Sequence, residues 1–539
     1  MRWPEAKAVR RLLPSLLLPA ILLVALALRL YGLDWDQGNL YHPDERSIYM
    51  RVDCMYQALT EAPGWRDCSE NRPFPKMQPG VPSLGTFFDA DKSALNPHWF
   101  PLGSILIYVL LLVKLALSPF AHMGLSDLAL AGRTLAALAD TASVAMAYLL
   151  GARLHGRKAG LLAAALLAVT VTAIQHAHFY RPESFTVLWV FCATWHMLNV
   201  IEKRRLRDSA LLGLFVGLAF ATKVSTAPLL IPVAIAYGVR LLWRRGEGWK
   251  APSLRMFGRI VGDAVLAGAV ALGVFLFWMP YAFIDLPQLL EDMARETRII
   301  RVPGIVPYTV QYLGTPRFWY EVRQSSVWGL GLPLGVVAWG GLLFALWRLA
   351  RSRWEARWGD LLLLAWIVPN LLIVGSFEVK FLRYVFPILP FMVLLGARML
   401  VWAVEWTREH WPRLRPWAVG AVAAVVAATA LYALAFAGIY SRPHTAVQAS
   451  RWINQNVPYG ATILTDNHWD EGFSELGRYK VKQIPIFEGD SRQKMEALAR
   501  DLASADYILF YSNRTYGSVA RAPQRYPLSA AYYQALFKG

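Results

Sequence analysis

The motif His-Pro-Asp-Glu at residues 42–45 places two adjacent carboxylates beside a proline, directly after a hydrophobic segment long enough to cross a membrane. Because neighbouring side chains diverge, Asp44 and Glu45 would meet different surroundings, and one of them would face the membrane surface. A carboxylate that is desolvated on one side is suited to accept a proton from a hydroxyl group. We therefore predict Asp44 and Glu45 as catalytic groups. A solvated loop start or a helix cap is the alternative interpretation.

A similar arrangement occurs in the segment Tyr-Arg-Pro-Glu-Ser, which lies between two later apolar runs. Pro182 favours a helix start there, and Arg181 offers an ionic partner to Glu183. We predict Glu183 as a third catalytic acid. Simple capping of the following helix is the alternative.

Several cations have the spacing expected of a phosphate site. Lys223 lies between two apolar runs, where a charge costs roughly 2.5–3.5 kcal/mol at a helix centre unless it is paired or functional. Lys380 and Arg383 lie three residues apart and would share one helical face, which suits a phosphate held by a point charge and a planar fork. A snorkelling lysine and an interfacial anchor are the alternatives. The predicted phosphate-binding residues are Lys223, Lys380, Arg383, Tyr384 and Arg46.

Histidines accompany these charges. We predict that His42, His98 and His178 contact the acceptor or its loops. The sequence has no metal-type Cys/His spacing, phosphate-binding loop or dinucleotide fingerprint, so no motif requires a cofactor. A divalent metal is the one candidate cofactor, with Glu45, Glu183 and His98 as its candidate ligands.

The composition indicates the elements that must position these groups. Of 539 residues, 56% are hydrophobic and only 17% are charged, which is typical of membrane proteins rather than soluble ones. The net charge of +18 is spread over short clusters between apolar runs, which is the positive-inside pattern rather than a nucleic-acid surface. We therefore predict a polytopic α-helical membrane protein in the lipid bilayer, with no nucleic-acid partner.

The basic clusters set the predicted orientation if all of them are cytoplasmic. The apolar run at 102–120, which Pro101 and Pro119 bracket, must then be a juxtamembrane or re-entrant segment of a large first outer loop. About eleven spans remain, an odd number, so the N-terminus is predicted inside and the C-terminus outside. The predicted spans are 12–31, 131–151, 159–177, 185–201, 208–223, 226–243, 260–281, 329–350, 360–376, 383–404 and 417–438.

Two further features lie outside these spans. The tail has alternating strand and helix patterns, which predict an extracytoplasmic α/β domain at 441–539 after a membrane domain at 1–440. Residues 285–301 are amphipathic and are predicted to rest on the outer interface, covering a groove for a lipid tail. Cys54 and Cys68 share the first outer loop, where an oxidising compartment would allow a disulfide.

The order of these motifs resembles a known group. A first span followed by "HPDE", a loop ending in "FFDADKSALNPHWFPLGS", then "AGRTLAALAD", "HFYRPESF", "LAFATKVSTAPLL" and "KFLRYVFPILP", is similar to phospholipid-carrier-dependent glycosyltransferases of the GT-C fold, in the protein O-mannosyltransferase and aminoarabinose transferase superfamily. The resemblance implies that Asp44 is the catalytic base and that Glu183 supports the site. It also implies that Lys223, Arg383 and Tyr384 bind the carrier phosphate. Glu183 stands where relatives commonly have Asp, and "NPHWFP" lacks an acid found in the aminoarabinose enzymes.

The expected activity is an inverting transfer of a hexose or pentose from a polyprenyl-phosphate carrier to a protein, lipid or glycan acceptor. It would occur on the extracytoplasmic side of what we expect to be a prokaryotic plasma membrane. A lipid-linked sugar transporter or flippase is one alternative, but it would have polar or broken helices at mid-membrane and two related halves. A receptor or scaffold that uses the C-terminal domain is the other alternative, and it leaves the clustered acids unexplained.

Overall fold

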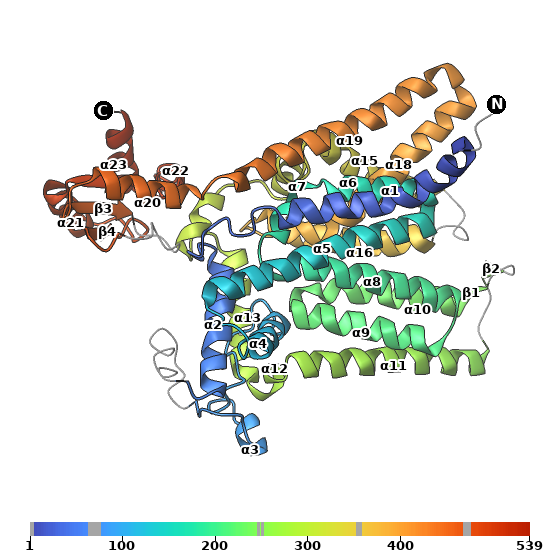
Figure 1. The fold of residues 1–539 in the computed structure, drawn as a ribbon, viewed down its shortest axis with the longest axis horizontal. Coiled ribbons are helices and arrows are strands. Elements are labelled where there is room, and N and C mark those ends of the chain that lie inside the picture. The colour runs from blue at the N-terminus through green and yellow to red at the C-terminus, as the bar shows by residue number, and fades with distance from the viewer. Residues whose placement is uncertain are drawn as a thin grey trace.

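The computed structural model describes residues 5–62, 77–244, 248–249, 253–351, 358–466 and 476–538. Its main body is a bundle of long helices that run along one direction (Figure 1). These helices are α1 (Glu5–Leu30), α5 (Leu125–His155), α6 (Arg157–Ala168), α7 (Val171–Ala177), α8 (Pro182–Glu202), α9 (Leu206–Thr222), α10 (Leu230–Leu242), α11 (Leu254–Trp278), α15 (Leu332–Arg351), α16 (Trp358–Gly375), α18 (Leu389–His410) and α19 (Arg415–Ala437).

The bundle is that of an integral, multi-pass membrane protein. Within the described residues, 8 helices are long and apolar enough to cross a bilayer, or 9 if α6 and α7, which meet at 58°, form one bent span. The other two predicted spans correspond to α9, which has 17 residues, and to α1, whose apolar part is counted from Leu16 to Leu30. A helix therefore occupies each predicted span region, while the number of crossings stays a prediction.

Buried charges inside the bundle are paired, as the low dielectric of a membrane requires. Arg29 on α1 lies 2.5 Å from Asp140 on α5 and also donates to the carbonyl oxygens that end α6. Small residues bring α9 against α11, because a Cβ atom at Gly213 or Gly217 would collide with the α11 backbone.

Shorter helices cross one end of the bundle. Figure 1 shows α2 (Pro43–Leu59) running across the bundle direction and α4 (Ile105–Leu117) viewed end-on beside it. With 13 residues, α4 spans about 20 Å and is too short for a hydrocarbon core of about 30 Å. This agrees with the prediction that 102–120 does not cross. The amphipathic segment forms the helix α13 (Leu286–Arg301), while its place on the outer interface over a lipid groove stays a prediction.

Short elements connect these helices. They are α3 (Leu84–Phe87), η2 (Val224–Leu229), β1 (Trp243–Arg244), β2 (Gly248–Trp249), α12 (Tyr281–Ile284), η3 (Pro307–Tyr312), α14 (Trp319–Gln324), the π-helical η4 (Ser325–Gly329), α17 (Leu382–Val385), η6 (Phe386–Ile388), η7 (Pro412–Leu414) and η8 (Gly438–Ser441).

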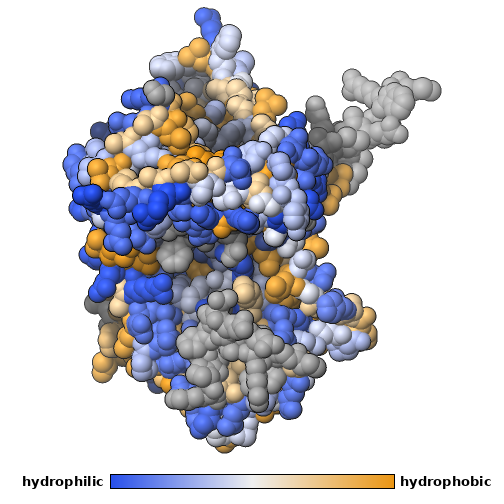
Figure 2. All heavy atoms as spheres, turned by 90° about the vertical axis from the view of Figure 1, so that its left-hand side faces the viewer, coloured by the Kyte–Doolittle hydropathy of each residue, from blue (hydrophilic) through white to orange (hydrophobic). Residues whose placement is uncertain are grey.

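After α19 the chain forms a small α/β unit, as predicted. Its parallel sheet has the order β4-β3-β5, with β3 (Thr462–Asp466) in the centre, β4 (Lys480–Ile484) on one side and β5 (Tyr507–Leu509) on the other. Its helices are α20 (Thr445–Asn456), α21 (Arg492–Ser504), α22 (Tyr516–Val519) and α23 (Pro527–Lys538). The unit and the start of α1 lie at opposite ends of the bundle (Figure 1). Hydrophilic residues cover much of the face at the C-terminal end (Figure 2).

The predicted disulfide falls partly outside this description. Cys54 is buried on α2, and Cys68 lies outside the described residues. The pairing of these two cysteines stays a prediction.

Candidate active site at the start of α2

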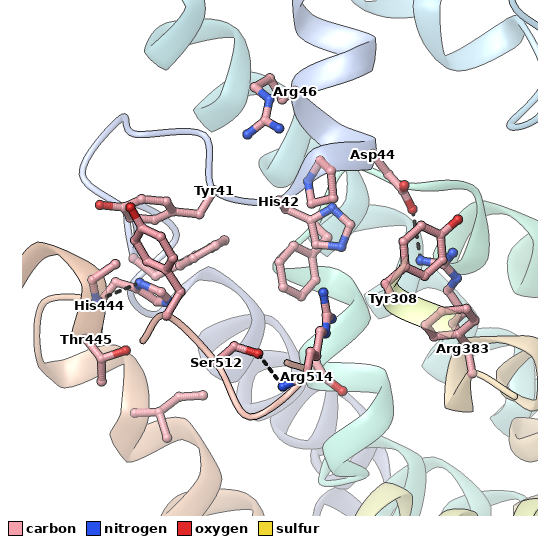
Figure 3. A pocket seen from close by; sticks show the side chains of 18 of the residues that line it. Tyr41, His42, Asp44, Arg46, Tyr308, Arg383, His444, Thr445, Ser512 and Arg514 are labelled. Carbon is pink, nitrogen blue, oxygen red and sulfur yellow. Dashed lines mark hydrogen bonds and ion pairs between the residues drawn. The ribbon is translucent and has the colours of Figure 1, made fainter. Parts of the chain in front are cut away.

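A pocket of about 1630 Å³ opens between the start of α2, α13, α17 and the chain that follows α19 (Figure 3). Pockets for single small molecules are usually about 300–1,000 Å³, so this one has room for two reacting groups. Asp44, His42, Arg46 and Arg383 are among its lining residues.

Asp44 lies on the pocket wall at the first turn of α2. Pro43 occupies the first helical position, and the acid after it lies near the helix N-terminus, where negative charge is favoured. Its Oδ2 accepts from Nη1 of Arg383 at 3.0 Å and lies 3.2 Å from Nη2 of Arg181. Burial opposes ionisation of the carboxyl, but these two guanidinium groups outweigh it and lower the pKa of Asp44 to about 2. Asp44 is therefore ionised, with 24% of its side chain exposed.

Arg181 joins Asp44 to the second predicted acid. Its Nη2 lies 3.2 Å from both Asp44 Oδ2 and Glu183 Oε1. As predicted from Pro182, α8 begins here, so Glu183 lies in its first turn. Lys223, which caps the end of α9, donates to the same Glu183 oxygen at 3.2 Å. The structure thus gathers Asp44, Glu183, Lys223 and Arg383 into one network, with Glu183 and Lys223 behind the pocket wall.

Aromatic rings hold the cations of this network in place. The guanidinium of Arg383 lies 4.5 Å from the ring centre of Phe381 and 5.6 Å from that of Tyr384. The ammonium of Lys223 lies 5.8 Å from the centre of the Tyr384 ring. Cation–π contacts of this kind fix where a charge lies. Tyr384 therefore helps to position two of the predicted phosphate ligands, Lys223 and Arg383.

Glu45 faces away from the pocket, contrary to the predicted catalytic role. It is fully buried and pairs with Arg133 of α5, whose Nε and Nη2 lie 3.2 and 3.1 Å from its two oxygens. It also accepts from the Tyr49 hydroxyl at 2.6 Å and the Tyr180 backbone N–H at 2.8 Å. The two Nη atoms of Arg133 also donate to the two carboxylate oxygens of Asp36. Both oxygens of Glu45 are thus occupied by donors from Arg133, Tyr49 and the Tyr180 backbone. These contacts join α2 to the bundle.

The sequence prediction is also wrong for Lys380, which it placed on one helical face with Arg383. It precedes α17, so it does not share a helical face with Arg383. Its ammonium is buried, donates to the Phe377 carbonyl at 2.7 Å and lies 3.4 Å from Glu321. Lys380 is thus a partner of Glu321 and does not line the pocket. Arg46 does line it, and donates to the Leu40 carbonyl at 3.1 Å.

The three predicted histidines have separate surroundings. His42 caps α2 and lines the pocket; burial, with the charge of Arg181, lowers its pKa to about 3, so it is neutral. His98 lies 3.3 Å from Asp285, and His178 lies between two backbone carbonyls and stacks on Tyr440.

The predicted metal ligands do not come together. Glu45 is bound to Arg133, Glu183 to Arg181 and Lys223, and His98 lies against Asp285. Among the described residues, no three His, Cys, Asp or Glu side chains are grouped so that they could hold a metal ion. The proposed ligand set therefore does not fit a metal site.

Several pocket residues were not predicted as site residues. Tyr308 and Glu296 line the wall near Arg383, and burial raises the pKa of both, that of Tyr308 to about 12. Arg514, Ser512 and His444 come from the C-terminal part of the chain. They are only partly buried and come from polar segments, so no costly charge inside an apolar run singles them out in the sequence.

A second, apolar groove of about 640 Å³ lies between α9, α10 and α11. Phe220 and Val224, which line it, flank Lys223 in the chain. The groove therefore reaches Val224, the residue that follows Lys223 in the chain.

The sequence profile of the dolichyl-phosphate-mannose-protein mannosyltransferase family matches residues 111–278. No curated protein sequence matches the chain.

Solved structures match along nearly the whole chain. The oligosaccharyltransferase AglB from Archaeoglobus fulgidus, in complex with an inhibitory peptide and a dolichol-phosphate, matches with a TM-score of 0.51 and 14% identity, over 97% of this chain and 72% of its own. An Archaeoglobus fulgidus oligosaccharyltransferase tethered to an acceptor peptide matches with a TM-score of 0.53 and the same identity and coverage. ArnT from Cupriavidus metallidurans, bound to undecaprenyl phosphate, matches with a TM-score of 0.45 and 14% identity, over 92% of this chain and 89% of its own. The chain therefore has the GT-C fold, and over residues 111–278 it is similar to dolichyl-phosphate-mannose-protein mannosyltransferases.

Proposed function

We propose that this protein is an inverting glycosyltransferase that moves a hexose or pentose from a polyprenyl-phosphate carrier to a hydroxyl acceptor. The observation that carries the proposal is the ionised Asp44, which lines a large pocket and lies next to the Arg181, Glu183 and Lys223 network. The match to a family of lipid-phosphate-sugar-dependent enzymes supports the same reaction class.

In the proposed reaction, Asp44 accepts the proton of the acceptor hydroxyl as that oxygen attacks the anomeric carbon. A new carbon–oxygen bond forms on one face of the sugar while the bond to the carrier phosphate breaks on the other. The phosphate leaves with the bonding electrons, and Arg383 stabilises its growing negative charge. The anomeric configuration is inverted because there is a single displacement.

Donor binding would also activate Asp44. In the free protein, Arg383 holds this carboxylate at 3.0 Å, and its low pKa makes it a weak base. A carrier phosphate that binds Arg383 competes for the guanidinium and adds negative charge nearby. Both effects raise the pKa of Asp44, so the base becomes effective only when the donor is in place.

The apolar groove between α9, α10 and α11 suits the carrier's tail. Its lining includes Val216, Phe220, Leu272 and Phe275, together with Val224, which follows Lys223 in the chain. A prenyl chain in this groove would bring its phosphate to the Lys223 and Arg383 side of the site. Lys223 would then exchange Glu183 for the phosphate.

We place this site on the extracytoplasmic side. The start of α1, with its basic residues, lies at the bundle end opposite to the C-terminal unit (Figure 1), and residues of that unit line the pocket. The acceptor, whether protein, lipid or glycan, would therefore enter from outside the cell. No step of the proposed reaction uses a metal ion.

Replacing Asp44 by Asn tests the proposal in the full-length protein, with a labelled polyprenyl-phosphate sugar as donor and native membranes as the source of acceptor. Loss of a general base should lower transfer by about 10²–10⁴-fold. Asp34→Asn is the matched control, because Asp34 is exposed and lies outside the pocket lining. Unchanged transfer in Asp44→Asn would reject the catalytic assignment. Movement of the intact lipid-linked sugar without transfer would support the flippase alternative.

A further inference from the structure

The wall opposite Asp44 comes from the C-terminal part of the chain. Residues 435–449 and 511–514 line it, and Figure 3 shows His444, Thr445, Ser512 and Arg514 on this side. Its basic lining residues are Arg442, His444 and Arg514, and none of its described lining residues is an aspartate or glutamate. This wall is therefore a cationic, hydroxyl-bearing surface that faces the proposed base.

The topology of the C-terminal sheet places the Arg514 loop where ligands commonly bind. After β3 the chain adds β4 on one side and then crosses to add β5 on the other. In open parallel sheets, ligands bind beyond the carboxyl ends of the strands at such a reversal of strand order. The loop that leaves β5, with Tyr511, Ser512 and Arg514, begins there and lines the pocket.

Several contacts hold this wall over the site. Val310 of η3 is buried in the hydrophobic core of the C-terminal unit, and Arg525 donates to the Gly304 carbonyl at 2.8 Å. The His444 ring packs against Trp35 and Tyr41, which precede α2. The C-terminal unit is thus fixed to the two segments that carry Tyr308 and Asp44.

We propose that this wall is the acceptor site, and that Arg514, with Arg442, binds a phosphate or carboxylate group on the acceptor. The inference rests on the proposed function and adds an acceptor class, a hydroxyl compound that carries an oxyanion. Figure 3 shows the Arg514 side chain pointing from its loop into the pocket, toward the side on which His42 lies. An acceptor anchored there would present its hydroxyl to Asp44, while the donor phosphate is held at Arg383 on a different wall.

The anchoring loop has the rigidity that such a site needs. The Arg514 backbone N–H donates to the Ser512 hydroxyl at 3.0 Å, and the Thr515 hydroxyl donates to the Ser512 carbonyl at 3.2 Å. Thr515 is buried, which fixes the residue next to Arg514. A guanidinium fork suits the planar geometry of a carboxylate or two phosphate oxygens.

The test measures ligand binding by the full-length protein in lipid nanodiscs, using saturation-transfer NMR titrations. The probes are glucose, glucuronate and glucose 6-phosphate, with farnesyl phosphate as a donor-side probe. Both anionic sugars should bind at least about tenfold more tightly than glucose, and Arg514→Ala should remove most of that advantage. Tighter binding of glucuronate would indicate an acceptor that carries a carboxylate, and tighter binding of glucose 6-phosphate would indicate one that carries a phosphate. Arg514→Lys should retain part of the advantage.

Arg500→Ala is the matched control, because Arg500 is an exposed arginine of the same unit, outside the pocket lining. It should change none of the affinities, and Arg514→Ala should not change that of farnesyl phosphate. Equal binding of glucose and the anionic sugars would overturn the inference. So would a loss of farnesyl phosphate binding in Arg514→Ala, since Arg514 would then act on the donor. Asp44→Asn should keep its anion binding, so failure of the transfer reaction and failure of this inference are distinguishable.

Discussion

The two sides of the first turn of α2 differ although their carboxylates are adjacent in sequence. On the pocket side, 24% of the Asp44 side chain is exposed. Its partner Arg383 lines the pocket, and its buried partner Arg181 also pairs with Glu183. On the bundle side, the Glu45 side chain is fully buried and bound by Arg133, Tyr49 and the Tyr180 backbone. A ligand in the pocket can therefore reach Asp44 and Arg383, whereas the oxygens of Glu45 are already occupied by donors from the bundle.

This difference follows from helix geometry. Successive side chains on a helix point about 100° apart, so a helix that lies across the bundle must turn one of two adjacent acids inward. The inward acid fixes the helix, and the fixed helix then holds the outward acid at the pocket wall. Tyr49, four residues after Glu45, supports the inward side from the next turn. The scaffold and the reactive group are therefore neighbours with separate functions.

The strongest test of this comparison removes the inward acid. Glu45→Ala leaves Arg133 with one carboxylate partner and strips the Tyr49 hydroxyl and Tyr180 N–H of their acceptor. Breaking a buried ion pair in this way typically costs about 3–5 kcal/mol. We expect a large drop in thermal unfolding midpoint for Glu45→Ala in detergent. Asp44→Asn should lower the midpoint by less, because Asp44 is partly exposed and its loss leaves Arg181 paired with Glu183. Equal destabilisation by the two variants would contradict the separation of functions.

A smaller effect is expected when Asp44 is kept and its partner Arg383 is replaced. Arg383→Gln removes a charged hydrogen bond to the donor phosphate, worth about 1.5–3 kcal/mol, so the donor KM should rise about tenfold to a hundredfold. It also removes a positive charge that lowers the pKa of Asp44. That pKa should rise from about 2 toward or above its ordinary value, and the acid limb of kcat/KM should move to higher pH.

The matched control for this shift is Arg317→Gln. Arg317 is an exposed arginine outside the pocket lining that pairs with Glu378. Its removal should change neither the donor KM nor the acid limb. An Arg383→Gln enzyme whose acid limb stays in place would mean that another group accepts the proton.

The same comparison explains what the sequence could and could not predict. Asp44, Glu183, Lys223 and Arg383 were predictable as a set, because charges at the ends of apolar helices are kept where they are paired or functional. The partners of Glu45 and Lys380 were not predictable, because Arg133 lies 88 residues from Glu45 and Glu321 lies 59 residues from Lys380. Spacing along one helix says nothing about such contacts.

The fold also divides into features that the sequence predicts and contacts that it does not. Apolar length predicted the regions of the long helices, because a bilayer imposes a minimum length. The orientation of the basic clusters, and not apolar length, excluded the run at 102–120 that contains α4 from the predicted spans. Sequence pattern also predicted the small C-terminal sheet. The docking of that unit over the pocket depends on contacts such as Val310 in its core and Arg525 at Gly304, which carry no local signal.

The smallest expected effect concerns Lys380, which the sequence placed beside Arg383. If it only stabilises the turn before α17, removing it together with its acid should leave donor binding intact. Lys380→Met combined with Glu321→Gln avoids leaving a buried charge unpaired, since both members of the pair become neutral. The donor KM of this double variant should stay within about twofold of the parent, well below the change in Arg383→Gln, because Lys380 is buried and does not line the pocket. A rise as large as that of Arg383→Gln would mean that Lys380 reaches the phosphate when the donor is bound, and the contrast between the two cations would fail.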